Sequence, residues 1–316
     1  MGAEYAKTLL HLGYGPAQVA VLGRSEERTG AFAERFGGME PLVAATGDER
    51  LPTFDAAILA VPPHQMPNVF GMVLAGGTRR LLLEKPGGMS AATVEQLARD
   101  AETVGAAAFA AYNRRFFGGV DQIRRLIAED GGVLSVVFDF SELEHRVVTD
   151  PVIRSWSDSP LERWGLINPP HILDLFIHLA GWPTEAEHRR SGSLPWHPSG
   201  AVFAGSGRTE RGALFAYAST WTGAGRWGIE IATPANKFTL RPLEAPKVQA
   251  ITGFAQSDLA FAPEPEGLKP GFFGLVSAFL GLPGGDPAHL CPLTDGARLL
   301  GFAEEIFGYE ADGAKF

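Results

Sequence analysis

The feature that most constrains the fold is an alternation that runs through the first third of the chain. Short apolar or β-branched runs are separated by longer amphipathic stretches, up to about residue 112. We expect strands at residues 18–22, 56–61, 80–84 and 106–112, and helices at residues 4–12, 25–36, 69–75 and 90–104. Because most strands are followed by a helix, the pattern predicts a parallel sheet with crossover helices.

The rest of the chain has a different pattern, with several strands and few helices between them. We expect strands at residues 134–142, 212–221, 226–233 and 237–242, and helices at residues 169–180, 272–280 and 295–307. Adjacent strands without crossover helices favour antiparallel pairing. A length of 316 residues suits two domains. We therefore predict an α/β domain at residues 1–113 and an α+β domain with a mostly antiparallel sheet at residues 114–316, for substrate binding and oligomerisation.

Charge and composition argue against several classes of partner. The formal net charge is -9, and acidic and basic residues are mixed along the chain. This argues against a nucleic-acid footprint and against binding to an anionic membrane surface. The single cysteine, Cys291, excludes an internal disulfide, and no apolar run reaches the ~18 residues that a membrane span needs. The first residues lack the pattern of a signal peptide, so we expect a cytoplasmic protein.

The first residues match the end of a dinucleotide-binding fingerprint. Rossmann-type domains place G-x-G-x-x-G between the first strand and the first helix, where backbone amides and the helix N-terminus hold a pyrophosphate. Here Met1-Gly2-Ala3-Glu4-Tyr5-Ala6 corresponds to the last glycine and the start of that helix. The fold class we predict is thus an N-terminally truncated Rossmann-type domain followed by the α+β domain.

A missing first strand has a structural consequence. The usual strand order of a Rossmann-type sheet is 3-2-1-4-5-6, in which the first strand is central. Without it, the two neighbouring strands would keep unpaired backbone groups, and each such group lowers stability by about 1 to 3 kcal/mol when buried. Our hypothesis is that the natural protein begins upstream of Met1. The alternative is a domain that has adapted to losing this strand and, with it, strong cofactor binding.

The residues after the second strand bear on cofactor choice. NAD-specific domains usually carry Asp or Glu there for the ribose diol, whereas this chain has Gly23, Arg24 and Ser25. A cation and a hydroxyl suit a 2′-phosphate, so we favour NADP slightly over NAD. The alternative is that Arg24 is an ordinary solvated residue.

Three motifs in order resemble one enzyme family. They are Glu84-Lys85-Pro86, Tyr112-Asn113-Arg114-Arg115-Phe116 and His171-x-x-Asp174. Together they resemble the Gfo/Idh/MocA oxidoreductases, relatives of glucose-fructose oxidoreductase and inositol dehydrogenase, over nearly the whole chain from Gly2. The resemblance implies hydride transfer between a nicotinamide and the hydroxyl of a sugar, amino sugar or cyclitol, with Lys85 beside the nicotinamide.

The chemistry of alcohol oxidation suits two of these residues. It needs a base for the hydroxyl proton and a cation or donor beside the oxygen. Lys85, at the carboxyl end of a strand, can polarise the oxygen, and His171 can take the proton. In the family an Asp commonly stands four residues before this His, but this chain has Ile167 there. The proton relay would then depend on His171 alone or on a water.

Further residues are assigned by the same motifs. We expect Pro62, His64 and Glu84 to contact the cofactor, together with Gly2, Arg24, Ser25 and Lys85. We expect the substrate site to contain these residues: Lys85, Asn113, Arg114, Trp164, Asn168 and His171. Asn168 also fits an N-cap with Pro169 as the first helical residue. The spacing of His171, Asp174 and His178 would also suit a metal, but such a site needs further ligands, and we predict none.

Other functions stay open. Ile167 and the incomplete fingerprint would suit a binding or regulatory protein that kept the fold and lost the reaction. A lyase or glycosidase-like enzyme on the same fold is a third possibility. Aromatic-rich strands suggest a sheet face for association, so we expect a homodimer or homotetramer.

Overall fold

The computed structural model describes residues 1–44, 51–150 and 160–309, with the side chains of residues 145 and 160 left out. The chain divides into two compact units. Unit 1 contains Met1–Gly88, Thr93–Phe116 and Glu264–Gly296, and unit 2 contains Met89–Ala92, Phe117–Pro263 and Ala297–Phe316. The domain boundary expected between residues 113 and 114 stays a prediction.

Unit 1 is built around parallel strands with helices between them. Its strands are β1 (Ala20–Gly23), β2 (Glu40–Val43), β3 (Ala57–Leu59), β4 (Arg80–Leu83), β5 (Ala107–Ala110) and β14 (Cys291–Pro292). Its helices are α1 (Gly2–His11), α2 (Glu26–Arg35), α3 (Met66–Ala75), α4 (Ala91–Thr103) and α10 (Phe272–Leu280), with short 3-10 turns at Pro16–Gln18, Pro63–Gln65, Asn113–Phe116 and Pro287–His289. The first two residues of α4 belong to unit 2. The predicted Rossmann-type class is confirmed.

The parallel strands of unit 1 form two sheets. One contains β1 and β2, and the other has the order β14-β5-β4-β3, with β14 antiparallel to β5. Among the described residues β1 pairs only with β2, and β3 pairs only with β4. The two sheets are separated at the position where the usual Rossmann strand order, 3-2-1-4-5-6, has its central strand. Strand β1 and most of β3 are only half-buried. The expected missing first strand stays a prediction.

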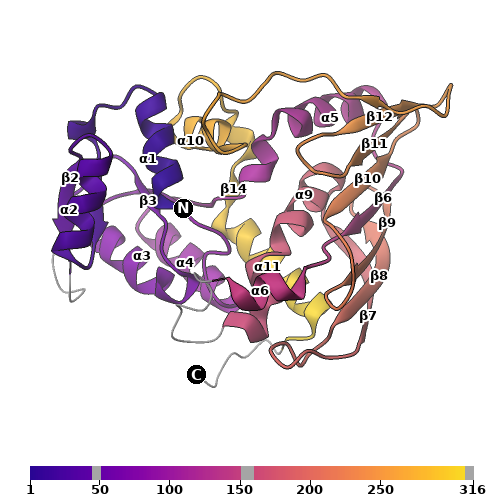
Figure 1. Cartoon of the computed structure of the whole chain (residues 1–316), viewed down its shortest axis with the longest axis horizontal. Coiled ribbons are helices and arrows are strands. Elements are labelled where there is room, and N and C mark those ends of the chain that lie inside the picture. Colours follow the sequence, from indigo (N-terminus) through magenta and orange to yellow (C-terminus); the bar gives the residue numbers. More distant parts are fainter. Residues whose placement is uncertain (45–50, 151–159, 310–316) are drawn as a thin grey trace. The chain divides into compact units, whose positions relative to one another are not determined.

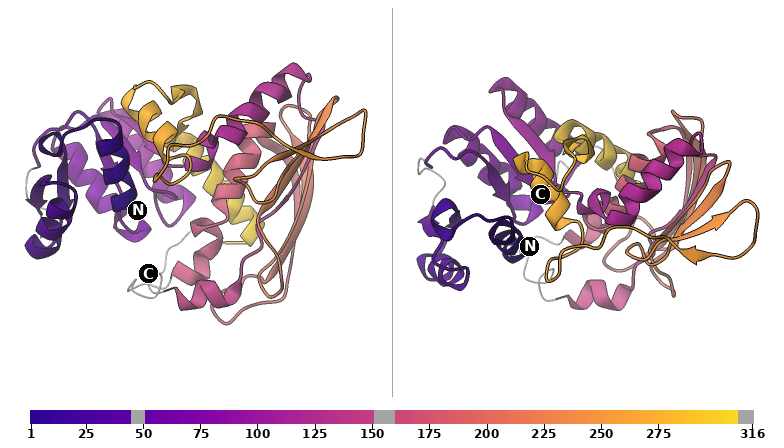
Figure 2. Two further views of the ribbon diagram at one scale, coloured as in Figure 1. Left: turned by 45° about the horizontal axis from the view of Figure 1, so that its top comes forward. Right: turned by 90° about the horizontal axis from the view of Figure 1, so that it is seen from above.

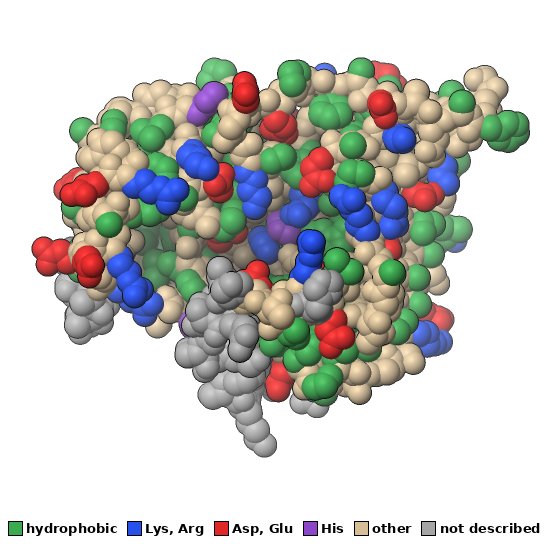
Figure 3. All heavy atoms as spheres, viewed as in Figure 1, with side chains coloured by type: hydrophobic (Ala, Val, Ile, Leu, Met, Phe, Trp, Pro, Cys, Tyr) green, Lys and Arg blue, Asp and Glu red, His purple; other side chains and the backbone are tan. Residues whose placement is uncertain are grey.

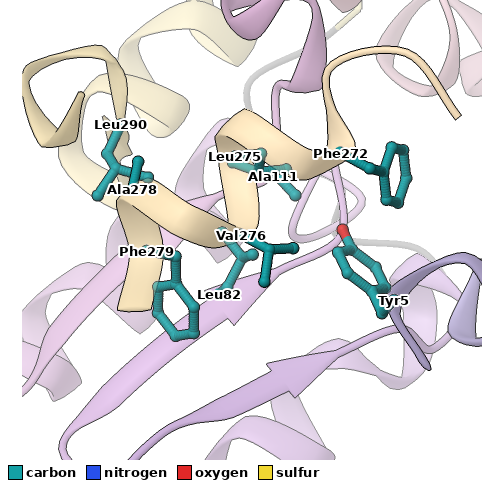
Figure 4. Packing of buried hydrophobic residues seen from close by; sticks show 9 residues of the cluster. All are labelled: Tyr5, Leu82, Ala111, Phe272, Leu275, Val276, Ala278, Phe279 and Leu290. Atoms are coloured by element: carbon teal, nitrogen blue, oxygen red, sulfur yellow. The ribbon is translucent and has the colours of Figure 1, made fainter. Parts of the chain in front are cut away.

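The core of unit 1 joins its first helix to a late segment of the chain. Helices α1 and α10 lie side by side (Figure 1). Figure 4 shows the apolar side chains that they share with the sheet, and these residues are Tyr5, Leu82, Ala111, Phe272, Leu275, Val276, Ala278, Phe279 and Leu290. Leu82 is fully buried because β4 has a strand on each side and helices above it. Strand β4 is therefore the best-anchored strand of unit 1.

Unit 2 is dominated by one large sheet. Its strands are β6 (Ser135–Asp139), β7 (Pro183–Ser191), β8 (Val202–Thr209), β9 (Leu214–Thr220), β10 (Gly228–Ala232), β11 (Asn236–Leu240), β12 (Lys247–Ala250) and β13 (Ser257–Asp258). The order is β13-β12-β11-β10-β6-β9-β8-β7, and only β6 and β9 run parallel. The predicted mostly antiparallel sheet is confirmed.

Helices cover one face of this sheet. They are α5 (Gly118–Glu129), α6 (Glu144–Thr149), α8 (Trp164–Ile167), α9 (Pro170–Ala180) and most of α11 (Leu293–Phe307). Figure 2 shows α9 next to the sheet, which it contacts at β6 and β10. Phe176 of α9 stacks on Phe138 of β6 with ring centres 4.8 Å apart, and Phe215 of β9 lies 4.9 Å from Phe176. These aromatic contacts hold α9 at the middle of the sheet.

The elements predicted from the sequence are present, with ends shifted by a few residues. Several others were not predicted: β2, β7, β8, β12, β13 and β14, and helices α5, α6 and α8. Strand β7 has the sequence PTEAEHRRS and β8 has VFAGSGRT, so neither has a clear apolar alternation. Both lie at or near the edge of the sheet, where polar side chains meet solvent on one face.

Two surface properties bear on partners. Acidic and basic side chains are interspersed over the face shown in Figure 3. No helix among the described residues is both long and apolar enough to cross a membrane.

Candidate functional site

Lys85 lies in a tight turn at the carboxyl end of β4. The amide of Glu84 donates to the carbonyl of Leu59 at 2.8 Å, and the amide of Gly87 donates to the carbonyl of Glu84 at 3.0 Å. Gly87 has φ 89°, which favours glycine and closes the turn. Lys85 is half-buried at the tip. A lysine is thus held on a rigid support at the end of a parallel strand, where open α/β sheets bind ligands.

Glu84 is held by helix α1. The hydroxyl of Tyr5 donates to Oε1 of Glu84 at 2.7 Å, and both residues are buried. Burial, followed by the charge of Glu84 and this hydrogen bond, raises the pKa of Tyr5 well above its ordinary value. Tyr5 therefore acts as a neutral donor. We expected Glu84 to contact a cofactor, but its Oε1 is engaged with Tyr5; a cofactor contact stays a prediction.

Gly2 begins helix α1, as the fingerprint predicts. A Cβ placed on Gly2 would contact only the Phe32 ring, at 3.8 Å, which is an ordinary packing distance. Packing within unit 1 therefore does not require glycine at this position. Close approach of a ligand to the helix N-terminus remains a physical reason for it.

The segment after β1 combines a capping residue with an exposed cation. The Ser25 hydroxyl accepts from the amide of Arg28 at 3.4 Å and caps α2. Arg24 is exposed. A Cβ on Gly23 would overlap the side chain of Thr29, so glycine is required there by packing.

The loops after β3 and β5 carry the remaining predicted residues of unit 1. Pro62 precedes the 3-10 turn that contains His64, and both are half-buried. Asn113 is buried and donates from Nδ2 to the carbonyl of Pro270 at 2.9 Å, while Arg114 beside it is half-buried. The Asn113 amide therefore anchors the chain just before α10.

His171 lies in the first turn of α9 and is 7% exposed. Its ring centre is 6.1 Å from that of Trp227. The amide of His171 donates to the carbonyl of Asn168 at 3.2 Å. Asn168 is not the N-cap that we predicted, because α9 begins at Pro170 with Pro169 as its N-cap, and the amide of His171 is bound by the backbone carbonyl of Asn168.

Asn168 instead contacts a buried carboxylate. Its Nδ2 donates to Oε1 of Glu142 at 2.7 Å, and Glu142 is 8% exposed. Sequence reasoning did not single out Glu142, although an acidic residue soon after strand β6 was a possible signal. The structure thus brings an acid to the start of α9, where Ile167, also buried, offers none.

Trp164 begins α8 and is 5% exposed. The role of Trp164 as a sugar-stacking residue stays a prediction. Among the described residues no group of three or more His, Cys, Asp or Glu side chains is arranged to hold a metal ion.

The predicted site residues fall into two sets. Unit 1 contains Gly2, Arg24, Ser25, Pro62, His64, Glu84, Lys85, Asn113 and Arg114, and unit 2 contains Trp164, Asn168 and His171. Within unit 2 the structure brings Asn168 and His171 together at the start of one helix. Tyr5 in unit 1 and Glu142 in unit 2 are the polar partners that sequence reasoning missed.

Comparison with solved structures shows the same fold in several proteins. The chain superposes on a UDP-N-acetylglucosamine 3-dehydrogenase from Acidithiobacillus ferrooxidans with a TM-score of 0.73 and 14% identity, covering 97% of this chain and 93% of that one. For levoglucosan dehydrogenase in complex with NADH and levoglucosan the TM-score is 0.72 and the identity 16%, covering 96% and 92%. For an oxidoreductase from Agrobacterium radiobacter in complex with NAD+, L-tartaric acid and magnesium, the TM-score is 0.70 and the identity 15%. The superposition covers 98% of this chain and 94% of that one. No family model and no curated protein matches the chain.

Proposed function

We propose that this protein is an NAD(P)-dependent oxidoreductase of the Gfo/Idh/MocA type. It transfers a hydride between a nicotinamide cofactor and a hydroxyl of a sugar, amino sugar or cyclitol. The observation that carries the proposal is Lys85, held in a hydrogen-bonded turn at the carboxyl end of β4. This is the place at which a Rossmann-type sheet presents side chains to its ligand.

Gly2, Arg24 and Lys85 fit a dinucleotide. Gly2 leaves the N-terminus of α1 open to a phosphate, and the exposed Arg24 suits a 2′-phosphate, so NADP is slightly favoured over NAD. Pro62, His64, Ser25 and Glu84 complete the proposed cofactor contacts. The neighbours crystallised with NADH or NAD+ support a nicotinamide without distinguishing the two forms. When bound, the cofactor would supply the hydride acceptor.

The proposed chemistry uses two side chains. Lys85 donates a hydrogen bond to the substrate oxygen and stabilises the negative charge that develops when the hydroxyl proton leaves. His171 accepts that proton at a ring nitrogen. Asn113, Arg114, Trp164 and Asn168 bind the rest of the sugar-like substrate. The levoglucosan bound to one neighbour supports this substrate class.

A second candidate function is a binding protein with a weakened cofactor site. Among the described residues β1 and β3 lie in separate sheets, so the strand edges that flank the usual phosphate-binding turn are unpaired there. The dehydrogenases and oxidoreductases among the structural neighbours do not favour this candidate. This candidate predicts no turnover and weak nucleotide binding.

Nucleotide titration and turnover distinguish the two candidates. NADPH and NADH are titrated by fluorescence, and oxidation of a panel of sugars and cyclitols is followed by NAD(P)H absorbance. We expect saturable binding, turnover of at least one sugar, and a loss of kcat/KM of about 100- to 1,000-fold in Lys85→Ala. The exposed Lys247 provides the matched control Lys247→Ala, which should behave as wild type. Turnover by Lys85→Ala at the control rate would refute the assigned role.

A further inference from the structure

The side chain of Glu84 joins the first helix of unit 1 to the turn that contains Lys85. Tyr5 lies one turn into α1, and its hydroxyl reaches Oε1 of Glu84, which is 79 residues further along the chain. Both side chains are buried, at 3% and 8% exposure. A hydrogen bond to a carboxylate in such a setting is stronger than one between neutral groups at the surface.

The Tyr5 ring has a fixed place. Its centre lies 5.0 Å from that of Phe272 in α10, and Tyr5 belongs to the buried apolar cluster that Figure 4 shows. Packing on several sides leaves the ring little freedom to rotate away. The hydroxyl is therefore presented to Glu84 by a rigid support.

Glu84 is tied at three points. Its amide donates to Leu59 of β3, its carbonyl accepts from Gly87, and its carboxylate accepts from Tyr5. The first bond ties the backbone of the turn to strand β3, and the second closes the turn itself. The bond from Tyr5 adds a contact from α1, the helix whose N-terminus carries Gly2.

We propose that Tyr5 is a positioning residue for Lys85: its hydrogen bond to Glu84 holds the Lys85 turn in a set position relative to the N-terminus of α1. This inference rests on the proposed function for the role of Lys85 and of the helix N-terminus. In that role the bond sets the distance between the group that polarises the substrate oxygen and the site of the cofactor phosphates. Loss of this bond should therefore lower the rate of the chemical step, because small displacements of a catalytic group reduce that rate strongly.

The test uses Tyr5→Phe, Glu84→Ala and the double variant in the full chain. Tyr5→Phe removes the hydroxyl and keeps the ring against Phe272. We expect kcat to fall about ten-fold, as for the loss of one hydrogen bond to a charged group, while KM for the sugar changes less than about two-fold. The double variant should be no slower than Glu84→Ala alone, because each single change already removes the same hydrogen bond between Tyr5 and Glu84. Tyr14→Phe, at a half-buried tyrosine just after α1, is the matched control.

Hydrogen exchange gives a readout that does not depend on turnover. Exchange of residues 84–88, followed by mass spectrometry, should be faster in Tyr5→Phe than in wild type and in Tyr14→Phe. Wild-type kcat in Tyr5→Phe, or losses that multiply in the double variant, would overturn the inference. If the wild type oxidises no sugar, the proposed function fails, and the exchange data still decide the inference: equal exchange of residues 84–88 in Tyr5→Phe and Tyr14→Phe would overturn it.

Discussion

Different local structures position Lys85 and His171. Lys85 follows a strand whose last three residues are fully buried, and a glycine at positive φ closes its turn. His171 follows two prolines that start a helix whose other residues are almost all buried. Motif and spacing predicted both residues, because a strand end and a helix start are local features. Tyr5 and Glu142 escaped prediction, since each meets its partner only through folding.

The role proposed for His171 makes a prediction about pH. In wild type, kcat/KM for sugar oxidation should fall as the pH is lowered, because a protonated imidazole cannot act as a base. In His171→Gln we expect a rate lower by about 100-fold or more and no such fall with pH. The matched control is His178→Gln on the same helix, which should keep the wild-type profile. An unchanged profile in His171→Gln would contradict the assignment.

Buried apolar helices and strands were predicted from the sequence more closely than polar elements at the edge of the sheet. Strand β4 and helix α9 were predicted closely, because each is apolar over most of its length and is buried in the structure. Strands β7 and β8 were missed because their residues are largely polar or small. The pairing of β7 with β8, and of β8 with β9, determines their conformation. Helix α5 was missed as well, although its apolar residues Val120, Ile123 and Ile127 recur at helical spacing.

The connection between β7 and β8 contains a histidine that should make stability depend on pH. His197 is fully buried, Nδ1 lies 2.7 Å from the carbonyl of Gly200, and Nε2 contacts the hydroxyl of Tyr309. Burial lowers the pKa of His197, and the Gly200 carbonyl opposes this only in part. Burial likewise raises the pKa of Tyr309, so that residue stays neutral.

Because the folded pKa of His197 is lowered, its contribution to stability is present above the unfolded value of about 6.5 and is lost as the pH falls below it. The unfolded chain binds a proton that the folded chain does not. The unfolding free energy, measured with urea at several pH values, should therefore decrease from pH 7.5 to pH 5 by up to about 1.4 kcal/mol per pH unit from this group. His197→Asn should reduce that slope, whereas His11→Asn at an exposed site should not. Equal slopes in all three proteins would contradict the prediction.

The molecule presents one sheet face that its own helices leave uncovered among the described residues. Val137, Val202 and Leu214 on this face are 54%, 41% and 53% exposed. Val137 of β6 pairs with Ala216 of β9, and exposed alanines continue the flat surface across β8 and β9. Apolar and small residues on one flat face suit contact with a second copy of the same face. We propose that the protein forms a homodimer there, with a homotetramer as the larger assembly.

Sedimentation velocity tests this proposal. Wild type should sediment as a dimer or tetramer at micromolar concentration, and Val137→Arg should shift it to the monomer because two buried cations would face each other across the interface. Ile251→Arg is the matched control, since Ile251 is 76% exposed but lies outside the sheet face. A monomeric wild type would refute the assembly. A Val137→Arg variant that stays oligomeric would refute this face.

The order of amino acids alone predicted a Rossmann-type unit followed by a mostly antiparallel sheet, and placed Lys85 at a strand end and His171 in a helix start. These properties depend on periodicity, on glycine and proline at specific positions, and on motifs within a few residues of one another. Contacts between distant residues decided the rest: residues 264–296 packing in unit 1, the separation of β1 from β3, and the bonds Tyr5–Glu84 and Asn168–Glu142. These contacts depend on which surfaces pack together when the chain folds, and no local sequence pattern determines them.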